Sequence, residues 1–411
     1  MRNILWIFLL VILTGCSIQQ KRFNELADQL PQQPPEKLVQ VLKKSSPNKT
    51  DVAQYYLNLG YLELLAGQFE SSIQSLTLAK NEMQLLAATS ISENAAASTI
   101  NETFRRYSGY PTDRVMVHNM LALSYLFNQN IEAARIEMLQ ADIAMKTVMK
   151  ENSTIGQLAS THLLSAIIYE LLDERSNAFI SYQLAESILI ERKMSIPNGI
   201  QHGLIRMSQQ MGNPEKYHYY SQKYSLHRDD DKQQRKVFHL HFDGVVSSKI
   251  ENSLMASGKH QLVRISMPAY PQPRHLIYPA YLMTQDQKIK SEVIENVEAI
   301  VREDLEQEYP SILLLTTTRA IAKYASVKAV DRHDPLLGAF FNLLTLWSEV
   351  ADLRSWNMLP STIQFSYLET KADTLFVSMK NDVQYPIFIG EGKQHVILSS
   401  SLSEDIFHYQ Q

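Results

Sequence analysis

The stretch YYLNLGYLELLAGQFESSIQSLTLA, residues 55–79, decides the fold of this 411-residue chain. Apolar side chains recur every three or four residues on both sides of a short turn, which predicts two helices joined by that turn. Gly60 stands midway through the first helix, and Ser72 and Ala79 stand in the second. Because antiparallel helices approach closely only where the facing side chains are small, these positions predict the contact between the two helices.

The same arrangement returns in HNMLALSYLFNQNIEAARIEMLQA, residues 118–141, and in HLLSAIIYELLDERSNAFISYQLA, residues 162–185. Three equivalent positions hold small residues: Gly60, Ala122 and Ala166 in the first helix, Ser72, Ala134 and Ala178 early in the second helix, and Ala79, Ala141 and Ala185 seven residues later. A large residue lies between the two small positions of the second helix: Leu76, Met138 and Tyr182. This pattern resembles the tetratricopeptide repeat, but the units are 62 and 44 residues apart rather than ~34, so insertions lie between them. Residues 203–224 are interpreted as a worn fourth pair. A generic helical bundle is the alternative, and the shared small residues favour the repeat.

The composition is that of a soluble globular body. The hydrophobic content is 45%, the charged content is 20% and the formal net charge is −4. A mildly acidic chain argues against a general nucleic-acid binder. The chain contains one cysteine, which excludes an intramolecular disulfide framework.

That cysteine ends the N-terminal stretch ILWIFLLVILTGCSI, residues 4–18. The ten apolar residues 4–13 reach roughly 15 Å as a helix, too short to cross a bilayer, and they follow a basic start, as in a secretory signal peptide. The residues Leu13-Thr14-Gly15-Cys16 resemble the lipobox of bacterial lipoproteins. The resemblance implies a signal peptide over residues 1–15 and a lipid attached to Cys16. Ser17, a residue other than aspartate, implies sorting to the outer membrane.

Residues 16–50 are expected to form a lipidated tether with one or two short helices, because PQQPPEK, residues 31–37, breaks any longer helix. Residues 51–226 form the expected helical domain. The charged stretch HRDDDKQQRK, residues 227–236, is the expected boundary, and residues 237–411 form the expected C-terminal α+β domain.

The chain as a whole resembles an uncharacterised family of Gram-negative outer-membrane lipoproteins with tetratricopeptide-like repeats. The resemblance rests on the lipobox, the helical repeats, YSGYPTDRVMVH at residues 107–118 leading into LALSYL, and RSWNMLPSTIQ at residues 354–364. Members are often encoded near activators of peptidoglycan synthases. The resemblance implies residence on the periplasmic side of the envelope and no catalytic residue.

In VFHLHFDG, residues 237–244, the alternation predicts a strand with Phe238, Leu240 and Phe242 on one face. His239 and His241 fall on the other face. Two such histidines are potential zinc ligands, but no third ligand occurs at a sequence spacing typical of a zinc site. We therefore interpret them as residues of an exposed face. The Pro- and Tyr-rich residues 268–281 are interpreted as an edge strand rather than an exposed recognition strip.

The rest of the C-terminal domain reads as helices followed by strands. An amphipathic helix is expected at about residues 288–306, and two apolar helices are expected at residues 311–329 and 335–353. For the apolar helices we favour a place in the core over a membrane surface, because the polar face lacks lysines. Asp334 before Pro335 is the expected helix start. Strands are expected at residues 363–368, 374–379, 385–389 and 395–400, with a hairpin turn at GEGK, residues 390–393, in an antiparallel sheet covered by helices.

The loop between the first two repeats carries Arg105, Arg106 and Arg114 around Tyr107 and Tyr110. An anion or partner contact is one interpretation, and an aromatic loop that packs on itself with solvated arginines is the favoured one. Thr112 is expected to cap the helix that follows.

The expected fold is therefore α+β, with a tetratricopeptide-like helical solenoid followed by a smaller domain with an antiparallel sheet. No recognised catalytic motif occurs, and the one S-x-x-K match, Ser46 to Lys49, lies in the expected tether. No cofactor or metal is expected. The leading hypothesis is a lipid-anchored periplasmic scaffold that binds an envelope protein through its helical groove. An envelope enzyme acting on the cell wall near His239, His241 or His333 is the alternative, and a purely structural tether is the third.

Overall fold

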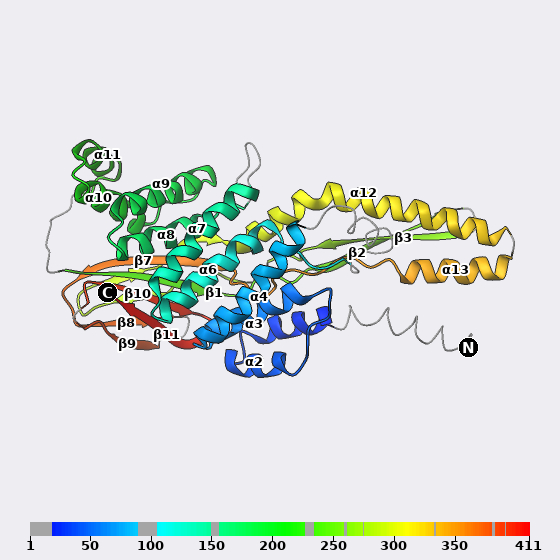
Figure 1. The fold of residues 1–411 in the computed structure, drawn as a ribbon, viewed down its shortest axis with the longest axis horizontal. Helices are drawn as coiled ribbons and strands as arrows, with labels where there is room; N and C mark the ends of the chain where they lie inside the picture. The colour runs from blue at the N-terminus through cyan, green and yellow to red at the C-terminus, as the bar shows by residue number, and fades with distance from the viewer. Residues whose placement is uncertain are drawn as a thin grey trace.

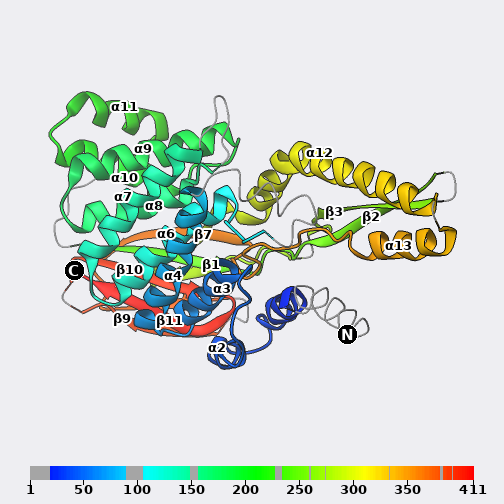
Figure 2. The same ribbon diagram turned by 45° about the vertical axis from the view of Figure 1, so that its right-hand side comes forward.

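The computed structural model describes residues 19–88, 105–148, 156–226, 234–258, 261–273, 275–332, 334–379, 383–390 and 392–411. The lipobox with Cys16, Ser17 and His333 lie outside the described residues. A stack of helices covers one face of a central sheet, a smaller sheet covers the other face, and two strands and two helices project to one side (Figures 1 and 2).

The helical region contains the four expected pairs of helices. The pairs are α3 (Val52–Leu65) with α4 (Phe69–Ala88), α6 (Pro111–Phe127) with α7 (Ile131–Val148), α8 (Ala159–Leu171) with α9 (Arg175–Glu191), and α10 (Asn198–Gln210) with α11 (Pro214–Tyr224). Consecutive pairs also contact each other, through α4 and α6, α7 and α8, and α9 and α10. The prediction of a repeated helical stack is confirmed.

Small residues set the distance between paired helices, as expected. A Cβ at Gly60 in α3 would lie 2.5 Å from Cγ of Leu76 in its partner α4. Between consecutive pairs, a Cβ at Gly203 in α10 would lie 2.6 Å from Cζ of Tyr182 in α9. The remaining predicted contact residues of the second and third pairs are all buried: Ala122, Ala166, Ala134, Ala178, Met138, Ala141 and Ala185. The large residues therefore fill the grooves that the small ones leave open.

The central sheet has the strand order β11-β10-β1-β7-β6. Its strands are β1 (Arg235–Asp243), β6 (Glu292–Asn296), β7 (Thr362–Thr370), β10 (Gln394–Ser400) and β11 (Ser403–Gln410). The neighbours β1 and β10 run parallel, so the expectation of a purely antiparallel sheet is wrong at this pair. The last strand, β11, escaped prediction because SEDIFHYQ does not alternate cleanly and one of its ends is strongly acidic.

A second sheet has the order β5-β4-β8-β9, from β5 (Lys288–Lys290), β4 (Tyr281–Met283), β8 (Thr374–Ser378) and β9 (Gln384–Phe388). Val237 of β1 and Ile397 of β10 form an apolar cluster with Leu282, Leu375 and Val377 of this sheet. The neighbouring residues Phe238 and Leu240 point to the opposite face and pack with the helices. Because β9 and β10 belong to different sheets, residues 390–393 connect two layers and do not form the expected hairpin.

Residues 19–43 fold onto the body rather than forming the expected tether. Residues 19–29 are helical, and α2 spans Pro35–Lys43. Phe23, Leu30, Leu38 and Leu42 are almost completely buried and belong to the main hydrophobic cluster. That cluster extends from these helices through the repeats to the central sheet, so the helical and C-terminal regions share one core.

The projecting part, which we call the arm, consists of β2 (Ile250–Gly258), β3 (Gln261–Ala269), the part of α12 from Ser311 onward, and α13 (Pro335–Trp347) (Figure 2). Helix α12 spans Val297–Asp331 and contains Pro310, where two separate helices were expected. The helix expected at residues 288–306 begins instead with strands β5 and β6. Helix α13 packs on α12 and β3, not between the strands and the helical stack, so its expected place in the core is wrong.

The start of α13 is the one that the sequence indicates. The side chain of Asp334 accepts hydrogen bonds from the backbone N–H groups of Leu336 and Leu337. Within the described residues, every helix is either too short or too polar to cross a bilayer.

Candidate functional site

The two histidines of β1 lie between the central and second sheets and are buried, not on an exposed face as expected. His239 Nδ1 is 2.9 Å from Ser366 Oγ, and its Nε2 is 2.8 Å from Ser399 Oγ. His241 Nδ1 is also 2.8 Å from Ser399 Oγ. Burial lowers the pKa of His239 to about 3 and that of His241 to about 4, so both rings are neutral at pH 7. The histidines cross-link strands through hydroxyl groups and do not line a cavity that a substrate enters.

Among the described residues, no group of three or more His, Cys, Asp or Glu side chains is arranged to hold a metal ion. His333 of the sequence-based enzyme hypothesis lies outside those residues.

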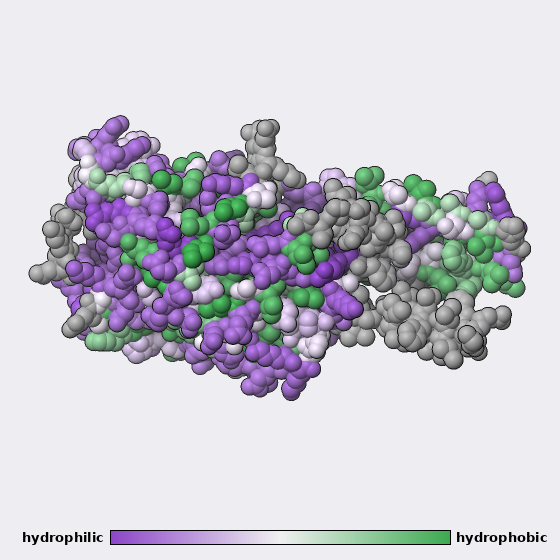
Figure 3. All heavy atoms as spheres, viewed as in Figure 1, coloured by the Kyte–Doolittle hydropathy of each residue, from purple (hydrophilic) through white to green (hydrophobic). Residues whose placement is uncertain are grey.

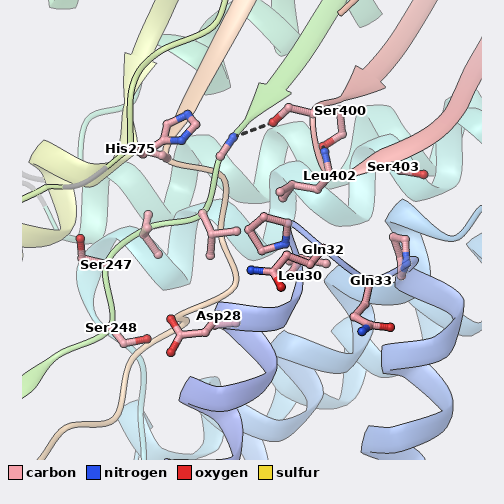
Figure 4. A pocket seen from close by; sticks show the side chains of 18 of the residues that line it. Asp28, Leu30, Gln32, Gln33, Ser247, Ser248, His275, Ser400, Leu402 and Ser403 are labelled. Carbon is pink, nitrogen blue, oxygen red and sulfur yellow. Dashed lines mark hydrogen bonds between the residues drawn. The ribbon is translucent and has the colours of Figure 1, made fainter. Parts of the chain in front are cut away.

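An open cleft of about 1190 Å³ lies between the N-terminal helices, the end of β1 and the start of β11 (Figure 4). Its lining combines neutral polar side chains, such as Gln32, Ser247 and Ser403, with His275 (Figure 4). The charged residues of the lining are Asp28, Glu36, Lys249, Glu298, Glu404 and Asp405. Sequence reasoning missed this cleft because its walls come from segments that lie hundreds of residues apart.

His275 of the cleft lining pairs with Asp243, which is buried at the end of β1. His275 Nε2 lies 2.8 Å from Asp243 Oδ2, which also accepts a hydrogen bond from the backbone N–H of Tyr278. Burial alone would raise the pKa of Asp243, but the hydrogen bonds from His275 and Tyr278 lower it. Among the described lining residues His275 is the single histidine, so the cleft does not bring together the several histidines that the enzyme hypothesis requires. The pair ties residues 275–278 to the end of β1.

The inner face of the helical stack, where we expected a partner, is occupied by the chain's own central sheet. All of α8 and nearly all of α3 are buried. A Cβ at Gly199 in α10 would lie 2.2 Å from the ring of Phe365 in β7, so helix and strand are in direct contact. Side chains of β1 and β7, such as Phe238 and Tyr367, complete the same core.

Three carboxylates of the C-terminal region bind the first turns of the repeat helices. Asp304 accepts from the N–H of Thr112 in α6 at 3.0 Å, and Glu295 accepts from the N–H of Ser160 in α8 at 3.0 Å. Glu292 accepts from the N–H of Asn198 in α10 at 2.8 Å. The first N–H groups of a helix have no partner within the helix, so the carboxyl oxygens that accept from them orient the stack on the sheet. Thr112 is therefore a capped residue inside α6 and not the expected cap.

The arginine-rich loop is the buried aromatic loop that the sequence favoured. Tyr107 is buried and donates a hydrogen bond to Asp113. Arg105 and Arg106 are exposed, and Arg106 forms an ion pair with Glu82. Arg114 donates to the carbonyl of Ser108 at 3.1 Å. The loop therefore packs on itself and on α4.

The second helices of the repeats carry exposed aliphatic side chains on the side away from the sheet. We call this set the outer face: Leu78, Leu85, Ile136, Leu139, Ile143, Ile180, Leu184 and Ile190 of α4, α7 and α9. Lys80 of α4 bonds to Glu137 of α7 at 2.7 Å, and Arg135 of α7 bonds to Glu174 at the start of α9, so the three helices lie in a row. Figure 3 shows apolar atoms distributed over this part of the surface among hydrophilic ones.

The outer face was readable in the sequence, because these second helices have apolar residues on both sides. IEAARIEMLQA places Ile136 and Leu139 away from the buried Ala134, Met138 and Ala141.

Comparison with known proteins gives weak structural similarities. No protein-family model matches the chain, and no curated protein matches it. RapI in its apo form aligns over 52% of this chain and 53% of its own, with 16% identity and a TM-score of 0.35. MamA of AMB-1 aligns over 52% of this chain and 96% of its own, with 14% identity and a TM-score of 0.33. BtubC from P. vanneervenii aligns over 47% of this chain and 74% of its own, with 12% identity and a TM-score of 0.32. The chain spans about half the length of RapI, and likeness at this level carries no conclusion about activity.

Proposed function

We propose that this chain is an outer-membrane lipoprotein that faces the periplasm and holds another envelope protein on its outer face. The observation that supports the binding role is the row of aliphatic side chains on α4, α7 and α9. Ile136 and Ile143 are 54% and 55% exposed, although both lie in well-packed helices of a stable stack. Apolar side chains that are exposed on neighbouring helices and bordered by polar residues are typical of interaction sites.

The proposal moves the binding surface from the groove to the opposite side of the stack. In this chain the inner groove is filled by β1 and β7, so a partner cannot enter without displacing the core. The outer face needs no rearrangement, since its side chains already lie in solvent. The lining of the cleft supplies a single imidazole, that of His275, which gives the enzyme alternative no comparable support.

The binding role is tested by photo-cross-linking in intact cells. A photoreactive amino acid at position 136 or 180 should give a discrete adduct with one partner, and the pair Ile136→Ser and Ile180→Ser should abolish an adduct formed from position 143. The matched control is the pair Leu314→Ser and Ile321→Ser on the arm, which should leave the adduct intact. If all outer-face positions gave only background labelling, the binding proposal would be contradicted and the hypothesis of a structural tether would be favoured.

The anchor is tested separately by fractionation. Lipid at Cys16 supplies two or more acyl chains, which hold a protein firmly at a bilayer. Cys16→Ser should therefore accumulate as unprocessed precursor and lose its fractionation with outer membranes. A Cys16→Ser variant that matures and fractionates as the natural chain does would contradict the proposed lipid attachment. It would not affect the test of the outer face.

A further inference from the structure

The arm has an apolar exterior. On α13, Leu336 is 84% exposed and Leu337 and Leu343 are more than half exposed. On α12, Leu314 is 68% and Ile321 is 65% exposed. Figure 3 shows this apolar surface on the projecting end of the molecule.

The hairpin continues the apolar surface. Leu254 and Met255 of β2 are both about two-thirds exposed, and as neighbours in a strand they point to opposite faces. The apolar surface therefore extends over more than one side of the arm, which distinguishes it from the single stripe of the outer face.

The interior of the arm contains apolar side chains, such as Ile312, Val327 and Leu346, together with paired charged groups. Asn342 of α13 faces β3, where its Nδ2 donates to the carbonyl of Leu262 at 2.8 Å. Glu349, 1% exposed in its side chain, receives Arg319 at 3.2 Å and Lys323 at 2.6 Å from α12. These charged and amide groups join α12, α13 and the hairpin to each other.

The exterior of the arm is apolar while charged groups are buried inside it, and this is not the distribution that water favours. A helix on a water-soluble protein turns its apolar side inward and its polar side outward. At lipid, charged and polar side chains turn toward the protein interior, where they pair, and the aliphatic side chains face outward. The arm therefore matches a lipid environment better than an aqueous one.

The described chain begins beside the base of the arm. Gln54 Nε2 donates both to Gln20 Oε1 at 3.0 Å and to the carbonyl of Ser355, just after the arm returns to the body. Asn357 donates to Asn24 Oδ1 at 2.9 Å. Figures 1 and 2 both place this N-terminal helix on the arm side of the body. Cys16 precedes Gln19 by three residues, which span at most ~11 Å when extended.

We propose that the arm is a membrane-docking element that lies in the interface of the same leaflet that holds the acyl chains of Cys16. This inference rests on the proposed lipid attachment, which brings that leaflet to the base of the arm. Helix α13, with 13 residues, is ~20 Å long against a hydrocarbon core of ~30 Å, so it lies along the surface and does not cross it. Arg319 and Lys323 are paired with Glu349 inside the arm, and the exposed cations Lys328 and Arg332 are balanced by the neighbouring carboxylates of Asp331 and Asp334. We therefore expect docking to depend on apolar burial and not on anionic lipid.

The test uses the mature chain, residues 16–411, coupled through its single thiol at Cys16 to a maleimide-bearing lipid in phosphatidylcholine vesicles. Leu336→Trp places a fluorophore on the exposed side of α13, and Ile136→Trp places one on the outer face as the matched control. Lipids brominated in their acyl chains should quench Leu336→Trp severalfold more than Ile136→Trp, after subtraction of the signal of Trp347 and Trp356. Added phosphatidylglycerol or 0.5 M salt should change neither value.

Equal or absent quenching of the two variants would overturn the proposal, provided both unfold in urea at the same midpoint as the parent chain. Absent quenching together with cross-links between arms of two chains would show that a second copy covers the arm, which also overturns it. Because chemical coupling replaces cellular lipid attachment, this experiment tests docking of the arm independently of the Cys16→Ser fractionation, which tests lipid attachment.

Discussion

At the scale of single residues, buried carboxyl groups join the helical stack to the C-terminal region. Asp304, 1% exposed, accepts the N–H of Thr112, and burial raises the pKa of Asp304 to about 7. Glu295 is likewise buried against Ser160, and burial raises its pKa to about 7. Both groups are protonated in the folded state at pH values where the unfolded chain has already released the proton.

The consequence is a loss of stability as the pH rises from about 4 to about 7, since the folded state binds more protons over that range. Asp304→Asn keeps the acceptor for Thr112 and removes the ionisation. We expect the variant to match the natural chain near pH 4 and to exceed it at pH 8 by on the order of 2–4 kcal/mol in urea unfolding. The exposed Asp405→Asn is the control, and parallel pH profiles for natural chain and Asp304→Asn would contradict the assignment.

Residue-level prediction from the sequence worked where a local rule decides. Asp334 before Pro335 caps α13, and Tyr107 is buried in its loop. The prediction of an exposed face for His239 and His241 was wrong. Alternation along a strand shows that its two faces differ in polarity, but it does not show that a second sheet covers the polar face. Cys16 stays a prediction, since it lies outside the described residues.

At the scale of elements, the packing of paired helices depends on positions without side-chain bulk. Gly60→Ala would gain about 1 kcal/mol in helix propensity but place its Cβ 2.5 Å from Leu76 Cγ, an overpacking that costs about 1–3 kcal/mol. We expect net destabilisation in urea unfolding. Leu76→Ala alone should cost ~2–5 kcal/mol through its cavity, and the double variant should cost less than the sum. Strict additivity would mean that the two residues do not share the contact.

Most elements followed from periodicity, and the misses have physical reasons. Residues 288–306 contain the strands β5 and β6 and the start of α12, because IKSEVIEN pairs with β4 and with the distant β7, which no local pattern reveals. Pro310 lies between the helices expected at residues 288–306 and 311–329, but α12 continues through it. The core position expected for α13 was wrong, because a lack of lysines on the polar face argues against anionic lipid and does not by itself place a helix in the core.

At the scale of the whole molecule, the helical stack and the sheet are parts of one core. The inner faces of α3, α6 and α8 pack against the central sheet and against residues 19–43. A chain ending at residue 226 should therefore expose that surface, bind an apolar dye and unfold without a cooperative transition, whereas the chain from residue 19 to 411 unfolds cooperatively. A sharp urea transition for the truncated chain would show that the repeats fold alone. The repeats can be predicted from the sequence, but no local pattern indicates that the central sheet fills their groove.

The parallel pairing of β1 with β10 has a consequence for biosynthesis. Strand β1 ends at Asp243, yet its two neighbours are β7 and β10, and the latter is complete only at Ser400. A chain that emerges from its N-terminus therefore presents the helices of the repeats long before their central strand has both neighbours. A premature stop codon just before β10 should consequently prevent folding of the whole body, and a chaperone that shields the helices should be needed until the last strands are present.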